Sequence, residues 1–133
     1  MSNKFQALLQ QFERAVGKFS DVLEQEKNEY MRDSAIQRFE FTFELAWKTL
    51  KAFLEEQGIT VYSPRDSFKG AFQLGLIDEE TTWLEMIELR NLRNLMTLTT
   101  HTYNESTAEE IYDALPRILV LYKKLLEELK VRP

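Results

Sequence analysis

The sequence predicts an all-α protein, an antiparallel four-helix up-and-down bundle with one additional short helix. Its 133 residues include only 4 glycines and 3 prolines, so long uninterrupted elements are expected. Apolar side chains recur at three- and four-residue steps, which is the period of a helix that buries one face. No segment alternates polar and apolar residues long enough to indicate a strand. Long helices joined by short connections pack most simply as antiparallel neighbours.

The first two helices are predicted from about Lys4 to Glu26 and from about Tyr30 to Gln57. The stripe of the first consists of Phe5, Leu8, Leu9, Phe12, Val16, Phe19 and Leu23. The stripe of the second consists of Ile36, Phe39, Phe43, Ala46, Trp47, Leu50, Phe53 and Leu54, widened by Phe41 and Leu45. Because this arc is wide, we expect the second helix to contact two neighbours. Gly58 should end it in a left-handed conformation.

A short third helix is predicted from its two ends. Ser63 and Pro64 have the residue types of an N-cap and of the first helical position. The helix should extend to about Leu74, where Gly75 closes it.

The fourth and fifth helices complete the bundle. Asp78 is the expected N-cap of the fourth helix. Ser106 or Asn104 should cap the fifth, and Ser106 is preferred because it stands three residues before Glu109, the spacing of a capping box. The stripe of the fifth consists of Ile111, Leu115, Ile118, Tyr122, Leu125 and Leu129. Pro116 lies inside this pattern and should kink the helix, because it removes a backbone donor.

Composition limits the classes of function. With 44% hydrophobic residues, the chain can bury a core, and residues 1–133 are expected to form a single domain. It has no cysteine, no run of about 18 apolar residues and no signal-peptide pattern at its start, so we expect a cytoplasmic protein without a membrane span. A net charge of -5 argues against binding nucleic acid mainly through phosphate neutralisation.

The segment from Arg90 to Tyr103 is where we expect any chemistry. On an unbroken helix, Arg90, Asn94, Thr97 and His101 fall at steps of four, three and four, and therefore on one polar stripe. A cation, an amide, a hydroxyl and an imidazole on one face suit the binding or cleavage of a phosphodiester. The alternative interpretation is a solvated helix face.

A second polar set lies on the second helix. Glu40, Glu44 and Lys48 follow one another at four-residue steps, which could indicate a carboxylate site. Metal ligation in a bundle usually needs further inward carboxylates or a Glu-x-x-His, and the sequence has none. We therefore interpret Glu44 and Lys48 as a surface ion pair and expect neither metal nor cofactor.

Several segments resemble the nucleotidyltransferase substrate-binding protein family of the HEPN superfamily. They are Arg38-Phe-Glu-Phe-Thr-Phe-Glu-Leu-Ala-Trp-Lys48, Ser63-Pro-Arg65, Trp83-Leu-Glu-Met-Ile87 and His101-Thr-Tyr-Asn-Glu105, followed by Thr107-Ala108. The resemblance spans residues 36–112. It implies a HEPN-like helical bundle that forms a homodimer and partners a minimal nucleotidyltransferase in a two-gene, toxin-antitoxin-like module. In related toxins, which are metal-independent ribonucleases, an arginine and a histidine form the active site and a tyrosine is adenylylated by the partner.

The family pattern carries over to this chain with one departure. His101 and Tyr103 match the His-x-Tyr of the pattern, but about six extra residues around 93–98 follow Arg90-Asn91-Leu92. Arg90 is 11 positions from His101, and Arg93 is 8. A continuous helix would separate the Arg90 and His101 backbones by roughly 16 Å, against roughly 7 to 8 Å for the usual spacing.

The resemblance supplies three hypotheses for these residues. In the first, the chain is the substrate-binding partner of a minimal nucleotidyltransferase; in the second, it is a ribonuclease acting on RNA; in the third, it is an inactive helical dimer. The candidate catalytic residues are Arg90, Arg93 and His101. The candidate substrate-binding residues are Asn91, Asn94 and Thr97, and Tyr103 is the candidate modification site.

Overall fold

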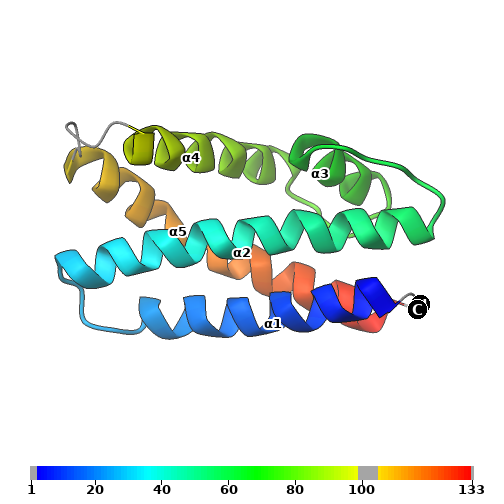
Figure 1. Ribbon diagram of the computed structural model, residues 1–133, viewed down its shortest axis with the longest axis horizontal. Coiled ribbons are helices and arrows are strands. Elements are labelled where there is room, and N and C mark those ends of the chain that lie inside the picture. The colour runs from blue at the N-terminus through cyan, green and yellow to red at the C-terminus, as the bar shows by residue number, and fades with distance from the viewer. Residues whose placement is uncertain (1–2, 99–104, 133) are drawn as a thin grey trace.

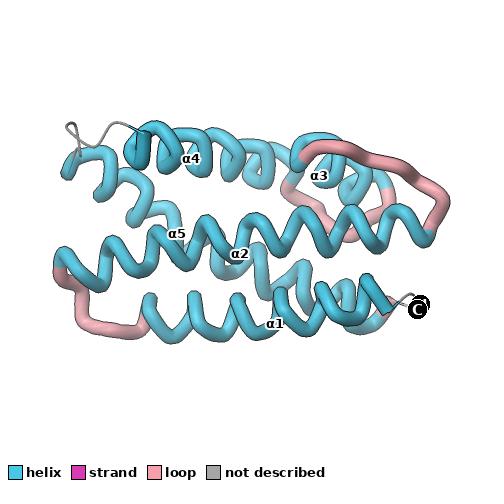
Figure 2. The backbone as a smooth tube through the Cα atoms, viewed as in Figure 1, coloured by secondary structure: helices cyan, strands magenta, loops and turns pink. Residues whose placement is uncertain are grey.

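The computed structural model describes residues 3–98 and 105–132 and contains five helices in this part of the chain. They are α1 (Asn3–Leu23), α2 (Glu29–Glu56), α3 (Pro64–Gln73), α4 (Glu80–Leu98) and α5 (Glu105–Val131). No strand occurs among the described residues, so the predicted all-α class is confirmed. Figure 2 shows loops joining the helix ends. None of the five helices combines the length and apolar character needed to cross a bilayer.

The four long helices run in alternating directions (Figure 1). Helices α1 and α2 lie side by side, α4 lies on the other side of α2, and α5 passes behind α2. Helix α2 contacts each of the other helices, and α3 packs between α2 and α4. This position explains why the apolar arc of α2 is wide, because a central helix must bury more than one face. Phe41, which was predicted to widen the arc, is instead 55% exposed.

Turn chemistry sets both ends of α2 and of α3. Asn28 caps α2 by accepting a hydrogen bond from the Met31 amide at 2.9 Å, and Ser63 caps α3, where Pro64 is the first helical residue. Gly58 and Gly75 follow α2 and α3 with φ of 82° and 75°, as the sequence predicts. Such left-handed positions favour glycine because a Cβ would crowd the backbone.

Two predicted caps are wrong by one or two positions. Helix α4 begins at Glu80, and the Trp83 amide donates to the Glu79 carbonyl, so Glu79 and not Asp78 occupies the N-cap. Helix α5 begins at Glu105, which places Ser106 inside its first turn. In both places several polar residues stand next to one another, and the sequence offers no local signal that selects among them. Pro116 lies within α5 as expected.

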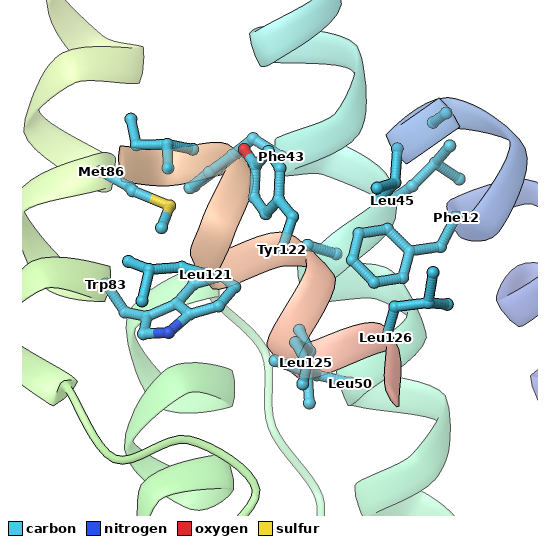
Figure 3. Close-up of a cluster of buried hydrophobic side chains, with 14 of the residues drawn as sticks. Phe12, Phe43, Leu45, Leu50, Trp83, Met86, Leu121, Tyr122, Leu125 and Leu126 are labelled. Atoms are coloured by element: carbon cyan, nitrogen blue, oxygen red, sulfur yellow. The ribbon is translucent and has the colours of Figure 1, made fainter. Parts of the chain in front are cut away.

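The core is one continuous aromatic and aliphatic cluster. Tyr122 of α5 is fully buried, and its ring centroid lies 5.8 to 6.1 Å from those of Phe19, Phe12 and Trp83. The cluster extends from Trp83 through Phe68 of α3 to α2. Figure 3 shows side chains of α1, α2, α4 and α5 meeting around Tyr122. This core holds α4 against α2, which positions the candidate site.

Candidate functional site

The second half of α4 carries the predicted site residues that the structure describes. Arg90 and Arg93 are half-buried, whereas Asn91 and Asn94 are exposed. Thr97 lies within α4, but its side chain is outside the description, and residues 99–104, which include His101 and Tyr103, lie outside the described residues altogether. The structure thus describes four of the predicted side chains.

Arg90 reaches across to α2. Its Nη1 donates to Glu44 Oε1 at 2.6 Å, and its guanidinium carbon lies 5.0 Å from the centroid of the Phe43 ring. Its side chain is 21% exposed, so the pair is only partly hydrated. A planar guanidinium can bind a carboxylate and stack on an aromatic face at the same time. Arg90 is therefore held in one orientation by α2.

One carboxylate of α2, that of Glu44, holds this guanidinium. Glu44 also accepts a hydrogen bond from Trp47 Nε1 at 2.9 Å, so both of its oxygens are engaged. Glu40 Oε2 and Arg90 Nε are shielded from solvent, and neither has a hydrogen-bond partner among the described side chains. Such buried orphan atoms are rare in folded proteins. The described part of the site therefore contains the Arg90 cation, which Glu44 and Phe43 of α2 hold in place.

The expected surface pair of Glu44 with Lys48 is not what the structure shows. Glu44 pairs with Arg90 of another helix, and Lys48 is exposed. Glu44 and Lys48 are one helical turn apart, so helix periodicity alone favours the local pair. The only signal for the observed pair is that Glu44 stands between the apolar residues Phe43 and Leu45, which both turn out to be buried.

Arg90 and Asn94, the two described side chains of the predicted polar stripe, lie on one face of α4 but differ in exposure. Asn94 is one turn beyond Arg90 but is exposed, while Arg90 packs against α2. Helix α4 continues to Leu98, eight residues after Arg90 and five after Arg93. At about 1.5 Å per residue, the backbone of Arg90 is roughly 12 Å from this end and that of Arg93 roughly 7.5 Å. Arg93 is therefore the arginine nearer to residues 99–104.

The start of α5 is fixed by a second cross-helix cluster. The buried Arg32 of α2 pairs with Glu105 at 2.5 Å, with Glu109 at 3.2 Å and with its neighbour Asp33 at 3.0 Å. Lys27 also pairs with Glu109. These carboxylates raise the pKa of Arg32, and the hydrogen bonds from Lys27 and then Arg32 lower the pKa of Glu109.

This second cluster was not predicted, because its members are far apart in sequence. Arg32 and Glu105 are 73 residues apart, and nothing in their local patterns links them. Arg32 holds Glu105, the first residue after 99–104, against α2. Within residues 3–98 and 105–132, no group of three or more His, Cys, Asp or Glu side chains is arranged to hold a metal ion.

Comparison with known proteins gives matches over nearly the whole chain. A family model described as nucleotidyltransferase substrate binding protein like matches residues 3–131. A protein of Haemophilus influenzae named probable ribonuclease HepT is 32% identical over 103 residues, which are 74% of this chain and 66% of that protein. The match therefore covers just under two thirds of that relative's length.

Solved structures share the fold. A Thermus thermophilus protein superposes with a TM-score of 0.77 at 36% identity, over 90% of this chain and 98% of its own. A Haemophilus influenzae protein, described as having the fold of a substrate binding domain of a nucleotidyltransferase, gives 0.66 at 28% identity over 96% and 98%. A Shewanella oneidensis HEPN toxin, solved AMPylated and in complex with the MNT antitoxin, gives 0.74 at 18% identity over 99% and 100%, a likeness of fold.

Proposed function

Because the chain belongs to the nucleotidyltransferase substrate binding protein like family, we propose that it is the HEPN-type subunit that partners a minimal nucleotidyltransferase and binds its substrate. The observation that carries this proposal is the extent of the family match, which includes all five helices. We further propose that the working unit is a homodimer, as the family resemblance implies.

The second half of α4 is the surface we assign to this role. Asn91 and Asn94 are exposed amides that can donate to a phosphate or accept from a base, and Arg90 and Arg93 supply positive charge beside them. Glu44 holds Arg90 in place, so its orientation does not have to be fixed when a ligand binds. A preorganised cation next to exposed amides suits a nucleotide or an RNA phosphate.

Co-purification tests the partnership. The chain and the minimal nucleotidyltransferase encoded beside it should elute together when co-expressed. Asn94→Arg places a large charged side chain on the assigned surface and should abolish co-elution. Thr81→Arg is the matched control, because Thr81 is also an exposed neutral residue of α4 but lies in its first turn. Separate elution of the unaltered proteins, or equal loss with both variants, would contradict the proposal.

A second candidate function is metal-independent RNA cleavage, which the relative named a probable ribonuclease favours. We propose that His101 takes the proton of a ribose 2′-hydroxyl, whose oxygen attacks the adjacent phosphorus, while the bond to the 5′-oxygen breaks and that oxygen gains a proton. The products are a 2′,3′-cyclic phosphate and a 5′-hydroxyl. An arginine stabilises the charge on the pentacoordinate phosphate.

RNA cleavage in excess chelator tests this mechanism. His101→Ala should lose activity, and Arg93→Gln should lose more than Arg90→Gln if the arginine nearer to the end of α4 is the one that contacts phosphate. Equal activity of the unaltered protein and His101→Ala would exclude the mechanism. A larger loss with Arg90→Gln would assign the phosphate contact to the arginine held by Glu44.

We propose Tyr103 as the acceptor of AMP from the partner enzyme, as the family resemblance implies. An added AMP would place a bulky anion beside His101 and the arginines, where an RNA phosphate would otherwise bind. Incubation with the partner and ATP should raise the intact mass by one or more AMP units, and cleavage should fall with it. An increment that persists in Tyr103→Phe would rule out this residue as the acceptor.

A further inference from the structure

A cavity of about 460 Å³ lies between α5 and the connection from α3 to α4. Its apolar lining consists of Leu76, Ile77, Trp83, Val120, Leu121 and Leu125. The volume is within the range of about 300 to 1,000 Å³ that small-molecule sites occupy. Trp83 is seven residues before Arg90, roughly 10 Å along α4, so this cavity is separate from the site proposed above.

One polar atom in the cavity wall lacks a partner. Trp83 is 1% exposed, and no hydrogen bond within the described part of the chain involves its indole N–H. Among the described side chains, the nitrogen and oxygen atoms that are both shielded and unpartnered belong to Glu40 and Arg90, so the indole nitrogen of Trp83 is not sealed off from solvent. Figure 3 shows this nitrogen on the edge of the ring that faces away from Tyr122 and Met86. A buried indole normally donates to an acceptor.

The wall that faces α5 is held in place. Arg132 donates to the carbonyl of Leu74 at 3.2 Å and to that of Gly75 at 3.3 Å, and it pairs with Glu128 at 3.5 Å. The connection from α3 to α4 is thereby tied to the end of α5. A cavity with a fixed wall binds a ligand without first having to order its own residues.

The charges around the opening nearly cancel. Lys123 and Lys124 line it together with Asp78, Glu127 and Glu128, and Glu128 is paired with Arg132. The two lysines are therefore balanced by the carboxylates of Asp78 and Glu127, so the opening has no net attraction for an ion of either sign. Inside the opening, the apolar lining and the Trp83 indole N–H determine the ligand chemistry instead.

We propose that this cavity binds a small uncharged molecule that is mainly apolar and carries one carbonyl oxygen, which accepts a hydrogen bond from the Trp83 indole N–H. The apolar body lies against Leu76, Leu121 and Leu125, and the carbonyl satisfies a donor that the protein leaves open. The same donor should discriminate between ligands, because a molecule of equal shape without an acceptor leaves the N–H unpaired.

Nuclear magnetic resonance of the indole N–H groups tests the proposal with acetophenone as the probe. The chain has two tryptophans, and the Trp47 N–H is bonded to Glu44, so its signal serves as an internal reference. Acetophenone should shift the Trp83 signal downfield in a saturable manner and leave that of Trp47 in place. Ethylbenzene, which has a CH₂ in place of the carbonyl, should produce no downfield shift at matched concentration.

Val120→Phe supplies a variant that blocks the cavity without altering the core. Val120 is 51% exposed and lines the opening, and Val131→Phe is the control because Val131 is 74% exposed at the end of α5, outside the cavity. The acetophenone shift should be lost in the first variant and kept in the second. No shift in the unaltered protein would overturn the proposal, as would a Trp83 signal that moves on protein dilution, which would indicate that a second copy fills the cavity.

Discussion

For Arg90, the sequence predicted a candidate functional residue but not the residue with which it pairs. Its place on a predicted polar stripe with Asn94 and His101 made Arg90 a candidate, because a cation, an amide and an imidazole on one face suit phosphodiester chemistry. Its partner could not be predicted, since the contact depends on the rotation of α4 against α2. That rotation is set by core residues such as Trp83 and Phe43 and not by the pair itself.

Glu44→Gln should destabilise the fold by about 1 to 2 kcal/mol, because it leaves the half-buried Arg90 cation without its counter-charge. The amide keeps an oxygen for the Trp47 N–H, so the loss reports the ion pair. The free energy of unfolding in urea measures it. Glu85→Gln is the control, since Glu85 is an exposed residue of α4, and its effect should stay within about 0.5 kcal/mol. Equal effects of the two substitutions would show that the pair adds nothing.

At the scale of the helices, the sequence predicted a helix end correctly where only one nearby residue has the chemistry that the end requires. Gly58, Gly75 and the Ser63 cap were predicted from their chemistry and are found in those roles. The predictions failed at Asp78 and Ser106, where neighbouring polar residues could each accept the same backbone hydrogen bonds. Local chemistry thus locates a helix end to within about two residues, and packing decides the rest.

Gly58→Ala should destabilise the protein by about 1 kcal/mol, because an L-residue at φ of 82° is strained. The matched control is Gly17→Ala, since Gly17 lies within α1 and its substitution should stabilise by about 0.5 to 1 kcal/mol through helix propensity. An added Cβ meets nothing within 4 Å at either position, so the two substitutions differ in backbone conformation alone. Thermal unfolding of both variants measures the difference, and effects of the same sign would contradict the assignment.

The Arg32 cluster makes the attachment of α5 to α2 sensitive to acid. The pKa of Glu109 is lowered by its hydrogen bonds with Lys27 and Arg32, so its ionised form stabilises the native state. That contribution is fully present above the ordinary glutamate pKa of about 4.5 and is lost as the pH falls through the lower native value.

Arg32→Met should therefore cost stability at neutral pH and less in acid. We expect a loss of about 1 to 2 kcal/mol near pH 7, moderated because the carboxylates around Arg32 are 40 to 60% exposed and can hydrate. Urea unfolding from about pH 7 to about pH 3 measures the difference from the unaltered protein, which should shrink below about pH 4.5. A difference that is independent of pH would show that the loss comes from packing.

At the scale of the whole molecule, the aromatic cluster joins side chains of all five described helices in one core. The apolar stripes named these residues correctly, and Phe12, Phe19, Phe43 and Tyr122 are all fully buried. Periodicity, however, predicts only the helix face on which a residue lies and not which residues of other helices it contacts. The contacts of Phe68 with Phe43 at 5.7 Å and with Trp83 at 5.0 Å needed the structure, because they join three different helices.

The buried phenol of Tyr122 makes the stability of the fold depend on pH in the alkaline range. Burial, and then the negative charge of Glu44, raise the pKa of its phenol well above 10, so the native state keeps the proton that the unfolded chain releases. Stability from this residue is therefore fully present below about pH 10 and is lost as the pH rises above it. Hydrogen bonds with Glu109 and Glu13 raise the pKa values of Lys27 and Lys130 above the ordinary 10.5. The stability that these charged lysines contribute is therefore also lost at alkaline pH.

Tyr122→Phe separates the phenol from these lysines. It removes a hydrogen bond to the Phe39 carbonyl of 3.3 Å, so the loss near pH 7 should be about 1 kcal/mol or less. Between about pH 9.5 and about pH 11, the variant should lose stability less steeply than the unaltered protein, because it has no buried phenol to ionise on unfolding. Tyr62→Phe is the matched control, since Tyr62 is 81% exposed and its substitution should leave the slope unchanged. Parallel slopes for all three proteins would show that the phenol of Tyr122 does not contribute to alkaline unfolding.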